Sequence, residues 1–403
     1  MDGVICMNRE DFEMLKNDIV YLDNGATTLK PHCVIDKMNE YFFHHTSNIH
    51  RGDYDAAIKT NQEYDRVRKI IADFVHADPD CCIYTSGTTM SLNMVVFGYM
   101  KKHLKKGDEV LLNKAEHASN ILPWIRLSEE IGIVLRYVPL NKDFSLTIDH
   151  IKQCVTSRTK VISLAHVTNV IGDVRDVEQI GEFCFQNHIL FNVDGAQSVP
   201  HMPVDFTKCH MDFLSFSGHK MCGPTGVGVL IGKKDLLEEM DPVFYGGGMN
   251  SYFEEDLSYE LKNVPTRFEA GTPPIAEVIG LGEAIKYLTS IGMNKIHEHE
   301  IQLKEYLLSK IKDISNLILY NQDSKSGILS FNFDGVFAQD SSIFLNHYHI
   351  YVRAGNHCAK MLKDEMGIKN TVRVSMYFYN TFEDIDRLVE CFKNSKDIFK
   401  VVI

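Results

Sequence analysis

Short apolar runs alternate with amphipathic stretches from about residue 21 onward, and this alternation is the main structural signal in the chain. Residues 160–166 (KVISLAH) predict a buried strand, and residues 174–188 predict a helix with one apolar face that includes Cys184. Further apolar runs predict strands at residues 189–193, 213–216 and 227–231. Strand, helix and strand with short joins form the crossover unit of an α/β protein with a mostly parallel sheet.

The pattern changes beyond about residue 284. Residues 296–311 predict a long amphipathic helix, and alternating positions predict strands around residues 327–333. The last predicted helix begins where Thr381 and Asp384 fit a capping box. Its apolar face consists of Ile385, Leu388, Val389 and Phe392.

These two patterns predict two domains. We expect a large domain at residues 16–285 and a smaller α/β domain at residues 286–403. A first helix around residues 11–16 is expected to pack on the small domain or on its neighbour, so that segment 1–15 joins the small domain.

Composition excludes several classes of protein. The 403 residues carry a formal net charge of -12, whereas general binders of nucleic acid or of anionic membranes need a basic surface. A long uncharged apolar stretch is absent from the sequence, so we expect no membrane span. The first ten residues lack the basic-then-apolar order of a secretory signal, and we expect a cytoplasmic protein.

The 10 cysteines are scattered, without a Cys-x-x-Cys pair or the Cys/His spacing of a metal site. This usage favours reduced cysteines that mostly serve as small buried residues, as we expect of Cys81, Cys82 and Cys184. Cys358 differs because Arg353, His357 and polar or glycine residues surround it. Such a segment is unlike a core strand, and nearby cations favour a reactive thiolate.

A lysine and an aspartate follow two successive predicted strands. Asp194 ends one apolar run, and Lys220 comes directly after the next. Alone, Asp194 is typical of a turn before glycine and Lys220 of a surface lysine. Together at one sheet edge they suit pyridoxal phosphate (PLP), because a lysine can form a Schiff base and a carboxylate can keep the pyridinium ring protonated.

Residues 84–89 (YTSGTT) predict a strand and a glycine turn, with a helix from about Ser91. This arrangement suits an anion at a helix N-terminus, although a plain Ser/Thr N-cap explains it equally well. Ser217 and His219 flank the lysine and are candidate phosphate donors. His117 follows an apolar run, and a solvated loop histidine is the alternative interpretation.

Five motifs occur in an order that identifies a known family. They are EHASN (116–120), DGAQ (194–197), SGHK (217–220) followed by GPTG (223–226), FEAGTP (268–273) and RAGNHC (353–358). The chain thereby resembles a group II (SufS-type) cysteine desulfurase, in the class V aminotransferase branch of fold-type I PLP enzymes. The resemblance runs from about residue 21 to residue 381 and implies a large domain with a mostly parallel, seven-stranded type of sheet and a smaller C-terminal domain.

The resemblance implies how PLP is held. Lys220 would bind it covalently, Asp194 would pair with the ring nitrogen, Gln197 would bond the ring hydroxyl, and His117 would stack on the ring and shuttle protons. The phosphate would contact Thr88, Thr89, Ser217, His219 and, from a second subunit, Thr272.

The resemblance also implies a substrate site. Arg373 would clamp the substrate carboxylate with two hydrogen bonds, and Asn169 would lie near the substrate and the ring hydroxyl. Arg353 would contribute to the same site, and His50 and Arg51 would line it near a dimer interface. The chain departs from the family's commoner residues at Met90, Ala118, Asn356 and Val374.

The implied reaction removes sulfur from L-cysteine. Cys358 as a thiolate would attack the substrate sulfur, which leaves L-alanine and a persulfide on Cys358. The implied partners are a second copy of the chain and a sulfur acceptor of the SufE or SufU type, in iron–sulfur cluster assembly by a SUF system.

Alternatives stay open at this point. A selenocysteine lyase would use the same residues, whereas a kynureninase-like hydrolase or an aminotransferase has no need of Cys358. A scaffold that keeps the fold without PLP is a further alternative, from a different class. Substituting Cys358 separates the second group from the first, and the colour of the purified protein tests for the cofactor.

Overall fold

The chain was analysed as a computed structural model that describes residues 9–50, 52–395 and 398. Its largest sheet has seven strands in the order β2-β8-β7-β6-β5-β3-β4. β8 runs antiparallel to both neighbours, and the remaining pairs are parallel, which confirms the predicted α/β class. The strands are β2 (Cys82–Thr85), β3 (Glu109–Asn113), β4 (Val134–Val138), β5 (Thr159–Ala165), β6 (Leu190–Asp194), β7 (Phe213–Ser217) and β8 (Gly228–Gly232).

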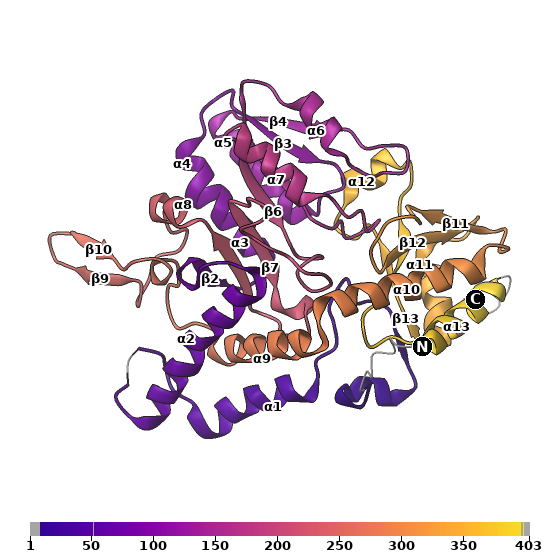
Figure 1. The fold of residues 1–403 in the computed structure, drawn as a ribbon, viewed down its shortest axis with the longest axis horizontal. Helices are drawn as coiled ribbons and strands as arrows, with labels where there is room; N and C mark the ends of the chain where they lie inside the picture. Colours follow the sequence, from indigo (N-terminus) through magenta and orange to yellow (C-terminus); the bar gives the residue numbers. More distant parts are fainter. Residues whose placement is uncertain (1–8, 51, 396–397, 399–403) are drawn as a thin grey trace.

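Helices cover both faces of this sheet (Figure 1). Successive strand side chains point to opposite faces, so Tyr84 joins one core cluster while Ile83 joins another. The helices around the sheet are α1 (His32–Glu40), α2 (Asp55–Val75), α3 (Thr88–Met94), α4 (Lys101–His103), α5 (Leu122–Ile131), α6 (Ile148–Cys154), α7 (Val177–Gln186), α8 (Lys234–Glu239) and α9 (Ile275–Ile291). Burial of both faces explains why the central strands are apolar throughout.

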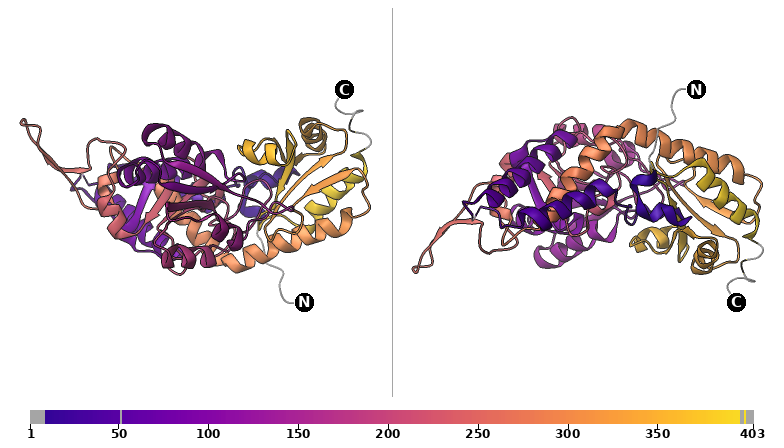
Figure 2. Two further views of the ribbon diagram at one scale, coloured as in Figure 1. Left: turned by 90° about the horizontal axis from the view of Figure 1, so that it is seen from above. Right: turned by 90° about the horizontal axis from the view of Figure 1, so that it is seen from below.

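A second, antiparallel sheet lies towards the C-terminal end of the chain, in the order β11-β12-β15-β14. Its strands are β11 (Leu317–Tyr320), β12 (Ile328–Phe333), β14 (Arg353–Gly355) and β15 (Thr371–Ser375). Its helices are α10 (Met293–Ile311), α11 (Ala338–His347), α12 (Lys360–Glu365) and α13 (Phe382–Lys393). The Thr381/Asp384 capping box of α13 is confirmed. α10 follows α9 and runs along the second sheet (Figures 1 and 2).

The start of the chain packs against this C-terminal part. β1 (Val20–Tyr21) pairs in parallel with β13 (Ile350–Tyr351). The predicted helix at residues 11–16 is wrong: two short 3-10 turns, Arg9–Asp11 and Glu13–Asn17, take its place. The extended backbone of Phe12 separates them and sends its ring onto Tyr379, with ring centroids 4.6 Å apart. Burial of one large ring therefore outweighs the continuity of a short helix.

A two-stranded hairpin projects from the end of the molecule opposite the C-terminal sheet (Figure 2). It consists of β9 (Asn250–Phe253) and β10 (Tyr259–Leu261), and it exposes several aromatic side chains. Among the helices of the described residues, none has the length and apolar character to cross a membrane.

Candidate active site

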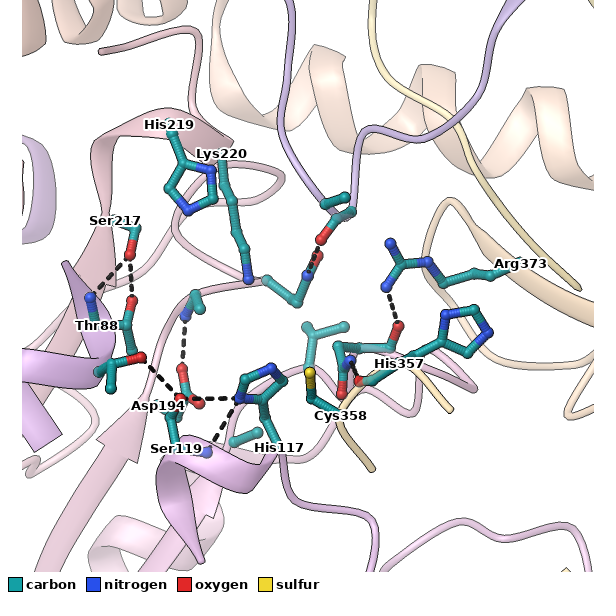
Figure 3. A pocket seen from close by; sticks show the side chains of 18 of the residues that line it. Thr88, His117, Ser119, Asp194, Ser217, His219, Lys220, His357, Cys358 and Arg373 are labelled. Atoms are coloured by element: carbon teal, nitrogen blue, oxygen red, sulfur yellow. Dashed lines mark hydrogen bonds between the residues drawn. The ribbon is translucent and has the colours of Figure 1, made fainter. Parts of the chain in front are cut away.

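A cavity of about 260 Å³ opens at the carboxyl edge of the large sheet. Asp194 ends β6 and Ser217 ends β7, and these two strands are parallel neighbours. The cavity also receives residues from the C-terminal sheet, so its walls come from both parts of the chain (Figure 3). The predicted site residues that line it are Thr88, Thr89, His117, Asn169, Asp194, Gln197, Ser217, His219, Lys220, Arg353, Cys358 and Arg373.

The Lys220 amine lies inside this cavity (Figure 3). Burial lowers the pKa of Lys220 to about 8, although the Asp194 carboxylate acts in the opposite direction. Burial raises the pKa of Asp194, and the backbone N–H of Ala196 donates to its Oδ1 at 2.9 Å. An amine with a lowered pKa is more often neutral and therefore a better nucleophile towards a carbonyl.

Hydroxyl groups and a helix N-terminus meet on one side of the cavity. Thr88 N donates to Ser217 Oγ at 2.8 Å, and the two side-chain oxygens are 2.7 Å apart. Gly87, before α3, has a φ of 147°. A Cβ at Gly228 in β8 would come within 2.4 Å of the Gly87 Cα, so Gly228 must be glycine, and the positive φ of Gly87 favours glycine there too. The result is a compact set of donors suited to an anion.

His117 is fixed by its own loop. The Ser119 N–H donates to His117 Nδ1 at 3.1 Å, so the neutral ring carries its hydrogen on Nε2. Burial, followed by the charges of Lys220 and Arg373, lowers the pKa of His117 to about 4. A neutral, half-buried imidazole in the cavity can stack on an aromatic ring.

A buried ion pair anchors this loop to the sheet. Glu116 pairs with Arg175, and both side chains are fully buried. Glu116 Oε2 also accepts from the Ala165 N–H at 2.7 Å, at the end of β5. The glutamate of the EHASN motif therefore has a structural task, because it holds His117 over the sheet edge.

Two amides present unsatisfied oxygens. Gln197 Nε2 donates to Gly25 O at 2.7 Å, and Asn169 Nδ2 donates to His357 O at 2.7 Å. Their Oε1 and Oδ1 atoms are buried and have no partner among the described residues. Because buried polar atoms are normally paired, these two acceptors indicate a bound group that donates hydrogen bonds.

Two arginines of the cavity share one carboxylate. Arg353 Nε lies 3.2 Å from Asp23 Oδ2, and Arg373 Nη2 lies 3.3 Å from Asp23 Oδ1. Arg373 Nη1 also donates to Asn169 O at 2.8 Å. The pair gives the cavity a positively charged wall that suits a carboxylate ligand.

Cys358 lies on an exposed loop between β14 and α12, and Figure 3 shows its sulfur pointing into the cavity. His357 and Cys358 have φ values of 53° and 56°, a left-handed conformation that costs about 1–2 kcal/mol for each residue with a Cβ. The Ala118 N–H donates to Cys358 O at 2.8 Å. Cross-contacts of this kind hold the loop against its strain.

The side chain of His357 forms no hydrogen bond with the thiol of Cys358, although the two residues are adjacent in the sequence. Its Nε2 is 3.0 Å from both Thr371 O and Thr371 Oγ1, and in Figure 3 the ring points away from the sulfur. Burial lowers the pKa of His357 to about 2, so the ring is neutral. The cations near the thiol are instead Lys220 and Arg373, which both interact electrostatically with Cys358.

Two of the predicted residues that the structure describes do not line this cavity. Thr272 and His50 line a second, smaller cavity of about 70 Å³, where Asn48 Nδ2 donates to Thr272 Oγ1 at 3.4 Å. Arg51 is outside the described residues. The expectation that Thr272 contacts a phosphate from a second subunit stays a prediction.

The same region explains the glutamate of the FEAGTP motif. Glu269 receives two hydrogen bonds from Arg68, at 2.9 and 2.7 Å, and a third from the Tyr84 N–H at 2.9 Å. Arg68 also lies 4.3 Å from the centre of the Tyr84 ring. Glu269 therefore fastens the segment before Thr272 to α2 and β2.

Sequence reasoning missed several residues of the site. Gly25 and Asp23 come from the segment after β1, and Arg175 supports the His117 loop. The order Tyr21-Leu22-Asp23-Asn24-Gly25, a turn directly after a predicted strand, was the available signal for the first two. Arg175 carried no local signal, because its partner Glu116 is 59 residues away.

A partly buried lysine near a strand-end carboxylate, at the edge of a mostly parallel sheet, is typical of enzymes that hold an aldehyde cofactor. The chain belongs to the aminotransferase class-V family, whose model matches residues 20–388.

Several similar proteins are named as cysteine desulfurases. A probable cysteine desulfurase of Halalkalibacterium halodurans is 39% identical over 390 residues, which cover 96% of both chains. The solved cysteine desulfurase of Thermococcus onnurineus is 34% identical with a TM-score of 0.93, over 96% of both chains. The Escherichia coli cysteine desulfurase CsdA, solved in an S-sulfonic acid form, is also 34% identical, with a TM-score of 0.91 over 97% of this chain and 98% of that one.

Proposed function

We propose that this chain is a PLP-dependent cysteine desulfurase that converts L-cysteine to L-alanine and keeps the sulfur as a persulfide on Cys358. The observation that carries the proposal is that one cavity holds the amine of Lys220, the carboxylate of Asp194 and the exposed thiol of Cys358. The names of relatives at 34–39% identity over nearly the whole chain support it.

The residues present fit PLP. Lys220 would bind it covalently and Asp194 would pair with its ring nitrogen, while the unpaired Oε1 of Gln197 would accept from the ring hydroxyl. Thr88, Thr89, Ser217 and His219 would hold the phosphate, joined by Thr272 of a second subunit, and His117 would stack on the ring. When bound, PLP withdraws electrons from the substrate and weakens its Cβ–S bond.

The chain's own groups carry out the remaining work. Arg373, with Arg353, would bind the substrate carboxylate, and Asn169 would bind beside it. His50 and Arg51 would line the site near the dimer interface. The Lys220 amine would remove the α-proton, which its lowered pKa allows near neutral pH.

Cys358 then forms the new sulfur bond. Its thiolate attacks the substrate sulfur, so that an S–S bond forms and the Cβ–S bond breaks. The carbon fragment keeps the bonding electron pair, takes up a proton and leaves as L-alanine. Lys220, which took up the α-proton, is the source of that proton, and His117 in the same cavity is the candidate relay.

The exposed loop of Cys358 suits onward transfer of the sulfur. We propose a homodimer that passes the persulfide sulfur to an acceptor protein of the SufE or SufU type, in iron–sulfur cluster assembly by a SUF system in the cytoplasm. We also propose the division into domains at residues 16–285 and 286–403, with the N-terminal segment 1–15 on the second; helix α9 crosses that boundary.

Mass spectrometry after incubation with L-cysteine tests the proposal. We expect one added sulfur on the peptide that carries Cys358, and equal yields of alanine and transferable sulfur when a reductant is present. The variant Cys358→Ala should keep the cofactor absorbance and lose sulfide release, whereas the control Cys154→Ala should keep both.

Other outcomes point to the alternatives. Unchanged turnover of Cys358→Ala would contradict the assignment of the nucleophile and favour a kynureninase-like enzyme or an aminotransferase. A strong preference for L-selenocysteine over L-cysteine would identify a selenocysteine lyase. Purified protein without bound cofactor, even after incubation with PLP, would contradict the proposal as a whole.

A further inference from the structure

A buried lysine lies behind the loop that carries Cys358. Lys363 belongs to α12, its side chain is fully buried, and its Nζ donates to Thr371 Oγ1 at 2.6 Å. Within residues 9–50, 52–395 and 398, no carboxylate forms an ion pair with it. Burial and the charge of Arg373 lower the pKa of Lys363 to about 7. A buried amine with so few partners costs folding free energy, so packing alone does not account for it.

Thr371 connects this lysine to the nucleophile loop. It begins β15 and lies opposite Gly355 in the β14–β15 pair. Its carbonyl oxygen and Oγ1 are both 3.0 Å from His357 Nε2. Because a carbonyl oxygen only accepts, Nε2 carries the hydrogen. Lys363, Thr371 and His357 therefore form one hydrogen-bonded chain that ends at the residue before Cys358.

The loop needs support from both sides. From the large sheet, Asn169 Nδ2 donates to His357 O and the Ala118 N–H donates to Cys358 O. From the C-terminal sheet, the described contact of the His357 side chain is the one to Thr371. A left-handed backbone at two successive residues with Cβ atoms persists only where such contacts outweigh the strain.

From this geometry we propose that Lys363 is a positioning residue for the Cys358 thiol. It fixes the Thr371 hydroxyl, which helps to hold His357 and thereby keeps the sulfur near Arg373, the cation that remains beside it when Lys220 holds PLP. Lys363 does not line the cavity itself, so its effect passes through Thr371 and His357. The inference concerns the reactivity of the thiol, and only its turnover readout depends on the proposed function.

The chain provides a matched control in Lys304 of α10. This second lysine is also buried, and its Nζ donates to Ser324 O and Ser324 Oγ at 2.7 and 2.6 Å. Burial lowers its pKa to about 7 as well. Neither Lys304 nor Ser324 lines the cavity. Lys304→Met therefore removes an equivalent buried amine without touching the Cys358 loop.

The experiment measures the rate at which iodoacetamide alkylates Cys358 at pH 7 in the PLP-loaded protein, by mass spectrometry of its peptide. The thiolate is the reacting form, and nearby cations favour it. We expect Lys363→Met and Thr371→Val to be alkylated about fivefold more slowly than wild type, and the double variant no more slowly than either. Lys304→Met and Thr371→Ser, which keeps the hydroxyl, should match wild type.

Turnover gives a second readout. We expect kcat with L-cysteine to fall in Lys363→Met and Thr371→Val while KM stays within twofold, because neither residue lines the substrate cavity. The inference would be overturned if both variants were alkylated at the wild-type rate, or if Lys304→Met slowed alkylation as much as Lys363→Met does. Should Lys363→Met fail to fold, Thr371→Val decides alone. Slower alkylation with unchanged turnover would support the positioning role and count against Cys358 as the nucleophile of the proposed reaction.

Discussion

At the scale of single residues, Asp23 determines how the guanidinium groups of Arg353 and Arg373 are arranged in the cavity wall. Arg373 is buried, whereas the side chain of Arg353 is 51% exposed. Two guanidinium groups repel each other unless an anion lies between them. Asp23 is that anion, and it comes from the turn after β1.

We predict that Asp23→Asn raises KM for L-cysteine about tenfold, because a charged hydrogen bond that orients both arginines is lost. The change in kcat should be smaller, since Asp23 does not line the cavity. Steady-state kinetics measure both values. Asp18→Asn is the control, because it breaks only the exposed ion pair with Arg387. A fall in kcat without a change in KM would contradict this role.

Most cavity residues could be predicted because each follows a recognisable local pattern. Asp194 and Lys220 follow two neighbouring strands, and Thr88 begins a helix after a glycine turn. Asp23 could not be predicted in its role, because that role depends on a contact with Arg373, 350 residues away. The direction of the His357 ring likewise depends on a contact with a residue distant in the sequence, Thr371. Its position next to Cys358 in the sequence does not predict that direction.

At the scale of elements, the nucleophile loop and the loop of His117 are joined by one backbone hydrogen bond. The Ala118 N–H donates to Cys358 O, although the two residues lie in loops that follow strands of different sheets, β3 and β14. Ala118 is the first residue of a short 3-10 turn, Ala118–Asn120, and His117 before it is extended, with a φ of -63° and a ψ of 148°. Proline fits such a position without strain.

We predict that Ala118→Pro lowers the rate of sulfur transfer to Cys358 by about tenfold, because proline removes this one donor and frees the loop to move. Cofactor binding at Lys220 should persist, which the absorbance of the bound cofactor reports. Ala118→Ser keeps the N–H and serves as the control. Equal rates in the two variants would mean that the bond does not hold the loop.

The closing helix offers a stability prediction. Thr381 Oγ1 accepts from the Asp384 N–H at 3.2 Å, within the capping box that begins α13. Thr381→Ala should reduce the free energy of unfolding by about 1 kcal/mol, as N-cap substitutions commonly do. Denaturant unfolding measures the change. Thr381→Ser keeps the hydroxyl and should stay near wild type; a comparable loss in that variant would contradict the cap as the cause.

Elements with a strong period were predicted within a few residues, and the weak ones were not. The predicted strand at 213–216 became β7 (Phe213–Ser217), and the helix at 296–311 became α10 (Met293–Ile311). The segment at 11–16 had too few positions to establish a period. There the ring of Phe12, which contacts Tyr287, Phe378 and Tyr379, determined the backbone instead.

At the scale of the whole molecule, the stability of the fold depends on pH, because several histidines near the large sheet are held in the neutral state. Burial lowers the pKa values of His117, His166 and His219 to about 4, from an ordinary value near 6.5. Because the unfolded chain binds protons that the folded chain does not, unfolding takes up protons between these two pH values. Their contribution to stability is therefore complete above pH 6.5 and is lost as the pH falls to about 4.

His166 isolates this effect, because it is buried at the end of β5 and does not line the cavity. A fully buried ring contributes at most about 1.4 kcal/mol per pH unit to the slope of unfolding free energy against pH. The carboxylates Glu116 and Asp194, whose pKa values burial raises, act in the opposite direction, so only the difference between variant and wild type is diagnostic. We predict that His166→Gln flattens the slope between pH 6.5 and 4.

Denaturant unfolding of the cofactor-free protein at several pH values measures this difference. His44→Gln, at an exposed position, is the control and should leave the slope unchanged. Equal slopes for His166→Gln and wild type would mean that His166 is charged in the folded protein. A charged ring would need a partner that accepts from Nδ1, which has none among the described residues, so the surroundings of His166 would have to rearrange on acidification.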